Sequence, residues 1–194
     1  CSLGQGTSAL ARRAATVSAV EVVHEQAVFA TLRLRQEGHS NVTVCAAGDD
    51  GRLPFPEGRF DLAVLNLVFE WCGQRDPGSF VEAQQRLLCE VARTLRPGGV
   101  LYLATKNRFG LHYVTGSADE HAHELRFGSA LPRPLLRLLL RAKGHPTRPP
   151  GLLHSLPALH RMLGAAGFGA VRPFWAAPDA RFPAAYVQAD PESI

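Results

Sequence analysis

The stretch "RFDLAVLNLV", residues 59–68, decides the fold class of this chain. After Asp61 it is apolar at almost every position, which is typical of a β-strand that is covered on both faces. Such strands occur mainly in parallel sheets, because the connecting helices pack on both sides of the sheet. The stretch therefore predicts an α/β protein with a mostly parallel sheet.

A helix and a second buried strand follow this stretch. Residues 79–95 carry apolar side chains at helical spacing, and residues 100–105 ("VLYLAT") are again apolar almost throughout. Between them, Pro97, Gly98 and Gly99 favour a turn. Strand, helix and strand in this order predict a right-handed crossover between parallel neighbours.

The segment before residue 59 shows the same alternation. It predicts a helix start at residues 8–15, strands at 16–23 and 41–48, and between these strands a helix at 25–38 that ends at Gly38. Strands that alternate with helices over about 100 residues are typical of a doubly wound sheet.

After residue 106 the alternation stops. Residues 107–128 predict a polar loop, 133–143 and 155–168 predict helices, and the segment after residue 170 predicts two closing strands. We predict a single domain over residues 1–194, with a doubly wound sheet that ends in an antiparallel pair. Residues 107–150 form an insertion in this scheme.

Composition excludes several classes of function. The chain has 194 residues, of which 46% are hydrophobic and 20% charged, as in an ordinary globular domain. The net charge of +4 comes from scattered arginines, so we expect no nucleic acid partner. The four cysteines lack ligand spacing, which predicts no metal site. No apolar run approaches the ~20 residues of a membrane span, and we expect a cytoplasmic protein.

Three features mark the carboxyl ends of the predicted strands, where ligands of open α/β sheets bind. The turn Gly4-Gln5-Gly6 allows close approach of a ligand to the backbone. Glu21 falls at the end of the strand predicted at residues 16–23, where a carboxylate can accept hydrogen bonds from a ribose. Asp49 follows the next strand, within reach of an adenine amino group. Together they predict an adenosine-containing cofactor, and a nicotinamide dinucleotide would use the first two features as well.

Residues 48–71 resemble the class I S-adenosylmethionine-dependent methyltransferases. The matching residues are Gly48-Asp49, Leu53-Pro54-Phe55-Pro56 and Phe60-Asp61, then Leu95-Arg96-Pro97-Gly98-Gly99 before the next strand and Ala166-Gly167-Phe168 near the end. The resemblance covers roughly residues 2–190 and implies a Rossmann-like methyltransferase fold with S-adenosylmethionine as cofactor. A nicotinamide-dependent oxidoreductase would leave the Leu-Pro-Phe run unexplained.

A narrower resemblance follows the strand at 100–105. Asn107-Arg108-Phe109-Gly110, Tyr113, Gly116 and His121 are similar to a bacterial methyltransferase subgroup that is associated with cell-surface polysaccharide pathways. It implies a saccharide or small-molecule acceptor at the 107–150 insertion, and an attached or partner transferase domain.

The family resemblance also assigns cofactor residues. Gly4, Gln5 and Gly6 would pack against the methionine part and the ribose, and Glu21 would bind the ribose hydroxyls. Asp49 or Asp50 would bind the adenine amine, and Asn66 would line the methyl end.

Methyl transfer is an in-line displacement, so the protein mainly orients two reactants and no nucleophilic triad is needed. A base assists when the acceptor is a hydroxyl, and His121 is the first candidate, with loop ordering as its alternative role. Tyr113 and Glu70 are lesser candidates. Arg108 would pair with an anionic acceptor, or else with Asp119 or Glu120.

The sequence departs from the family pattern at its start. Ser2 and Ser8 replace an acidic residue and a glycine, and the first strand is reduced to residues 1–3 with no helix before it. The expected activity is methyl transfer to a hydroxyl or related group of a saccharide or small metabolite. The departures favour an alternative, a degenerate domain that binds a partner.

Overall fold

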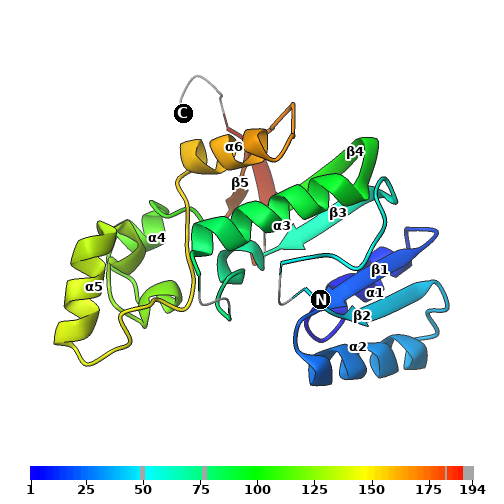
Figure 1. Cartoon of the computed structure of the whole chain (residues 1–194), viewed down its shortest axis with the longest axis horizontal. Coiled ribbons are helices and arrows are strands. Elements are labelled where there is room, and N and C mark those ends of the chain that lie inside the picture. Colours follow the sequence, from blue (N-terminus) through cyan, green and yellow to red (C-terminus); the bar gives the residue numbers. More distant parts are fainter. Residues whose placement is uncertain (49–50, 76–77, 182, 190–194) are drawn as a thin grey trace. The chain divides into compact units, whose positions relative to one another are not determined.

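The computed structural model describes residues 1–48, 51–75, 78–181 and 183–189. The chain divides into two compact units, Cys1–Pro56 and Glu57–Ile194 (Figure 1). Each unit has its own elements and its own buried residues.

The first unit contains one parallel crossover. Its elements are α1 (Gln5–Ala11), β1 (Val17–Glu21), α2 (His24–Gln36) and β2 (Val42–Ala46). β1 and β2 pair in parallel from Val17 with Val42 to Glu21 with Ala46. α2 buries Ala27, Ala30 and Leu34, which recur at helical spacing. The predicted strands and the helix between them are confirmed here.

Helix α1 begins three residues earlier than the sequence predicts, so Gly6 lies in its first turn rather than in a loop. Gly4 adopts φ +84°, and this left-handed residue reverses the chain in one step. Thr7 and Ser8 are buried, and the Ser8 hydroxyl bonds the Glu37 carboxylate. These tertiary contacts override the weak helix preference of Gly6.

The second unit contains the remaining elements. They are β3 (Phe60–Asn66), the single turn Phe69–Trp71, α3 (Phe80–Thr94), β4 (Leu95–Ala104), α4 (Leu111–Val114), the turns Glu120–Ala122 and Gly128–Ala130, α5 (Arg133–Ala142), α6 (Leu156–Ala165), β5 (Phe174–Ala177) and β6 (Ala185–Gln188). β3 and β4 are parallel, whereas β5 and β6 are antiparallel. The predicted closing pair is therefore confirmed.

Strand β4 starts before the predicted turn. Leu95 pairs with Phe60, and the ladder resumes with Val100 opposite Leu62. The intervening Pro-Gly-Gly segment forms an irregularity inside the strand, with Gly98 at φ +79°. The turn predicted at residues 97–99 therefore lies inside β4, as a register irregularity, instead of preceding the strand.

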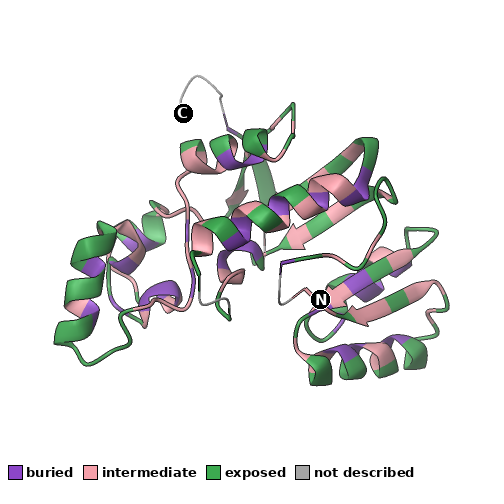
Figure 2. Cartoon of the chain, in the orientation of Figure 1, coloured by how far each residue is buried: buried purple, intermediate pink, exposed green. Residues whose placement is uncertain are grey.

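Two apolar clusters hold the second unit together (Figure 2). The first consists of Phe69, Leu88, Met162 and Leu163, which join α3 to α6, and side chains of β3 and β4 pack against it. The second consists of Ala122, Leu125, Leu136 and Leu140. This second cluster corrects the polar loop predicted for residues 107–128, because the segment contains short helical turns and packs its own core on α5.

The structure thus shows a Rossmann-like α/β architecture with two parallel strand pairs and one antiparallel pair among the described residues. A continuous doubly wound sheet, a single domain over 1–194 and an insertion at 107–150 stay predictions. Within the described part of the chain, every helix is too short or too polar to cross a membrane.

Candidate active site

Glu21 lies at the carboxyl end of β1 and is buried. Its Oε2 accepts hydrogen bonds from the nitrogens of Cys1 at 2.9 Å and Ser2 at 2.6 Å, and its Oε1 accepts one from Val23 at 3.1 Å. Burial raises the pKa of Glu21, but the hydrogen bonds from Cys1, Val23 and Ser2 outweigh it and lower the pKa. The site therefore presents an ionised, fixed carboxylate.

The Gly4 turn follows closely after Cys1 and Ser2, whose nitrogens donate to this carboxylate. Gly4 is buried, and an added Cβ would lie 3.4 Å from the Cβ of Ala30 on α2. Gln5 and Gly6 follow as exposed residues of α1. The first unit thus holds Gly4, Gln5, Gly6 and Glu21, whereas Asp49 and Asp50 lie outside the described residues.

The other predicted residues belong to the second unit. Asn66 is the exposed last residue of β3, opposite Ala104 at the end of β4. Both parallel strands end at this edge, and the role of Asn66 at the methyl end of the cofactor stays a prediction. Beyond β4, the Thr105 hydroxyl donates to the buried carboxylate of Glu70 at 3.1 Å.

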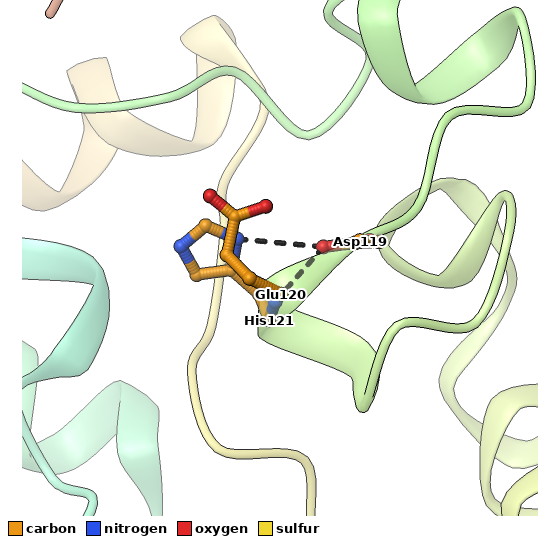
Figure 3. A group of neighbouring side chains, drawn as sticks. All are labelled: Asp119, Glu120 and His121. Atoms are coloured by element: carbon orange, nitrogen blue, oxygen red, sulfur yellow. Dashed lines mark hydrogen bonds and ion pairs between the residues drawn. The ribbon is translucent and has the colours of Figure 1, made fainter.

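His121 is buried. Figure 3 shows it beside Asp119 and Glu120. Its Nδ1 lies 3.4 Å from Asp119 Oδ1 and 3.4 Å from the Tyr113 hydroxyl. Its ring stacks on Trp71 with centroids 4.5 Å apart. The Nε2 atom is buried and has no hydrogen-bond partner among the described residues. This arrangement fixes the ring through one nitrogen and leaves the other available.

The negative charges of Asp119 and Glu120, which are drawn in Figure 3, are already balanced by hydrogen-bond donors and cations. Asp119 accepts backbone N–H groups from His121 at 3.0 Å and Ser129 at 2.6 Å, and these bonds lower its pKa against the opposing effect of burial. Glu120 pairs with Lys106 and Arg181. Together with His121 they lie close enough to bind a cation, yet these donors make the group better suited to orienting the histidine.

Arg108 makes neither of the two ion pairs considered from the sequence. Its Nε donates to the carbonyl of Ser129 at 2.7 Å, and its Nη2 donates to that of Leu131 at 2.6 Å. The expected alternatives, Asp119 and Glu120, use other donors. The local ion pair with Asp119 or Glu120 is therefore wrong, because main-chain carbonyls hold this guanidinium. The pairing of Arg108 with an anionic acceptor stays a prediction.

Arg108 and His121 line one cavity of about 480 Å³. Its wall also includes Arg133, Arg137 and Arg148, which the sequence analysis did not single out. The spacing of Arg133 and Arg137, four residues apart on a helix, was the available signal, because such residues share one helix face.

His154 is held near these arginines. The amide nitrogen of Gln84 donates to two carbonyls, so its oxygen accepts from His154 Nε2 at 2.7 Å. Burial, together with the charges of Arg133 and Arg108, lowers the pKa of His154 to about 4. The imidazole is therefore neutral in the folded protein at pH 7.

We expect acid to destabilise the second unit through His154. The unfolded chain binds a proton near pH 6.5, whereas folded His154 stays neutral to about pH 4, so stability falls as the pH is lowered through this window. After allowance for solvent screening the loss is about 2 kcal/mol. Urea denaturation between pH 7 and 4 measures it.

His154→Gln keeps a donor toward Gln84 and should flatten this pH dependence, whereas His112→Gln, at an exposed histidine, should not. An unchanged slope in His154→Gln would contradict the assignment.

Comparisons with known proteins agree with this architecture. Residues 1–103 match the family described as "Methyltransferase domain". The biotin biosynthesis bifunctional protein BioHC of Cellvibrio japonicus is 34% identical over 99 residues, which are 51% of this chain and 17% of that protein. The malonyl-[acyl-carrier protein] O-methyltransferase of Dechloromonas aromatica is 34% identical over 86 residues, which are 43% of this chain and 29% of that protein.

The chain thus spans less than a third of these curated relatives. Among solved structures, an S-adenosylmethionine-dependent methyltransferase from Mesorhizobium loti has the same fold. Its TM-score is 0.55 at 19% identity, over 90% of this chain and 71% of that chain. Because the family match covers more than half of the chain, the protein belongs to the family of S-adenosylmethionine-dependent methyltransferases, with S-adenosylmethionine as the family's cofactor.

Proposed function

We propose that this protein transfers a methyl group from S-adenosylmethionine to a hydroxyl or related group of a saccharide or other small metabolite. The observation that carries the proposal is the family match over residues 1–103, which includes the ionised Glu21 at the end of β1. The cofactor supplies the electrophilic methyl group, and the protein binds and orients both reactants.

The first unit offers a suitable acceptor for the cofactor's ribose. A carboxylate has about four lone-pair positions, and on Glu21 the amino group of Cys1 and the backbone N–H groups of Ser2 and Val23 occupy three. Glu21 therefore retains capacity for a ribose hydroxyl. Gly4, Gln5 and Gly6 are proposed to approach the methionine part and the ribose, and Asn66 to line the methyl end.

Adenine binding is assigned to the sequence pair at 49–50. By this proposal Asp49 or Asp50 accepts the adenine amine, as the family resemblance implies.

Arg108 and His121 are proposed to serve the acceptor. An oxygen nucleophile loses its proton as it attacks the methyl group, so a nearby base accelerates the step. Asp119 orients His121 through Nδ1, which leaves Nε2 to take the proton from an acceptor seated in the cavity. The relative named as an O-methyltransferase supports an oxygen acceptor. The saccharide class and a partner transferase domain are supported only by the narrower resemblance at 107–121.

We expect Glu21→Ala to weaken the binding of S-adenosylhomocysteine by about 10- to 100-fold, because charged hydrogen bonds to the ribose are lost. Isothermal titration calorimetry on the full-length protein measures the dissociation constant. Glu21→Gln keeps one acceptor oxygen and the side-chain shape, so its dissociation constant should lie between those of the wild-type protein and Glu21→Ala.

The matched control is Glu25→Ala, which removes an exposed carboxylate from the first turn of α2 and should leave affinity unchanged. A wild-type protein that fails to bind S-adenosylhomocysteine at millimolar concentration would exclude the enzyme and favour a partner-binding module.

A further inference from the structure

The cavity of the second unit has a strongly one-sided charge. Arg108, Arg133, Arg137 and Arg148 all contribute to its wall, and no acidic side chain does so among the described residues. Its volume of about 480 Å³ lies in the range of small-molecule sites. A concave surface whose charged side chains are all cationic attracts an anion.

Arg108 is built into the wall as a fixed donor. Two main-chain carbonyls, those of Ser129 and Leu131, hold one side of its guanidinium. Among the described residues, no carboxylate accepts from its remaining N–H groups. A guanidinium anchored in this way can bind a carboxylate or phosphate with little further ordering.

Arg133 and Arg137 bring two further charges to the same wall. They lie four residues apart on α5, so they share a helix face and repel each other. Burial, Arg108 and Arg137 all lower the pKa of Arg133, which shows that the three charges interact. No carboxylate of the described chain lies within ion-pair distance of Arg133 or Arg137. A bound anion would relieve this repulsion.

The rest of the wall is apolar or neutral. Phe80, Leu131, Leu136, Leu152 and Leu153 provide apolar surface. His121 also lines the cavity, with the buried and unpartnered Nε2 described above. The cavity therefore combines an anion-binding side with an apolar side and an imidazole.

We infer that this cavity binds the methyl acceptor by an anionic group, a carboxylate or a phosphate, held by Arg108, Arg133 and Arg137, while an apolar body packs on the leucines. The inference rests on the proposed function only in identifying the ligand as the acceptor. It narrows the acceptor from small metabolites in general to amphiphilic anions.

Direct binding tests the inference without cofactor or turnover. The probes are phenyl phosphate, benzoate and the neutral benzyl alcohol, titrated into the full-length protein by calorimetry at constant ionic strength. We expect at least one anion to bind about tenfold or more tightly than benzyl alcohol, because a charged hydrogen bond replaces a neutral contact. The comparison of phenyl phosphate with benzoate identifies the preferred group.

Three variants localise the binding. Arg133→Gln and Arg137→Gln should each weaken the binding of the anion by about tenfold and leave the affinity for benzyl alcohol unchanged. Both positions are exposed on α5, so these variants should fold. Arg161→Gln removes the same charge from an exposed position of α6 outside the cavity and should have no effect.

Equal affinity for anions and benzyl alcohol, or an equal loss in Arg161→Gln, would overturn the inference. Failure of this test beside normal S-adenosylhomocysteine binding would leave the methyltransferase proposal intact. Anion binding without S-adenosylhomocysteine binding would instead support the proposed anion site and contradict the proposed methyltransferase activity.

Discussion

Asp119→Ala is expected to lower the free energy of unfolding of the second unit by about 3 kcal/mol or more. Asp119 is fully buried, and its loss leaves the N–H groups of His121 and Ser129 without an acceptor. Each buried donor that loses its partner costs about 1–3 kcal/mol. Urea denaturation followed by tryptophan fluorescence measures the loss, since Trp71 stacks on His121.

Asp119→Asn distinguishes the contribution of the hydrogen bonds to the free energy of unfolding from that of the side-chain volume. It keeps the size and one acceptor oxygen, so its loss should be smaller than that of Asp119→Ala. Ser117→Ala, at a partly exposed position of the same loop, is the background control. If Asp119→Ala unfolds at the wild-type urea concentration, the carboxylate does not hold this loop.

The helices and strands were predictable because the patterns that specify them lie within short stretches of the sequence. Residues 59–68 and 100–105 are almost continuously apolar, which is typical of strands, and α3 between them has buried residues at helical spacing. Gly38 marks the end of α2, where it adopts φ +81°. These signals are local, so one sequence contains them completely.

The interior of the segment after Arg108 was not predictable in the same way. Its polar composition indicates a loop, yet Asp119 and His121 are buried by residues distant in the sequence. Trp71 stacks on the imidazole, and an added Cβ on Gly151 would lie 2.8 Å from His121 Cδ2. Such contacts depend on tertiary packing, which residue spacing along the chain does not reveal.

The candidate site residues also differ in whether their positions follow from local sequence or from tertiary packing. The position of Glu21 at the end of a regular strand was predictable, although the nitrogens that donate to its carboxylate were not. The arginine cavity was missed because its members, Arg108 from the loop after β4 and Arg133 and Arg137 from α5, meet only in the folded unit. In sequence they resemble a scattered basic composition.

His121 combines two properties that a general base needs. Asp119 and Tyr113 lie near Nδ1 and orient the ring. His121 lines the cavity, and its Nε2 has no hydrogen-bond partner in the part of the chain that the structure describes. A base of this kind typically contributes about 10²- to 10⁴-fold to a rate. By contrast, a histidine that only orders the loop would affect stability and leave the chemical step intact.

We therefore expect His121→Gln to lower kcat for an oxygen acceptor by about 10²- to 10⁴-fold, measured by release of S-adenosylhomocysteine. Its affinity for S-adenosylhomocysteine should stay within about twofold, because the proposed ribose ligand Glu21 belongs to the other unit. His112→Gln, at an exposed histidine before the same segment, should retain full kcat. A folded His121→Gln protein with wild-type kcat would restrict His121 to ordering the loop, and the acceptor's proton would then have to leave by another route.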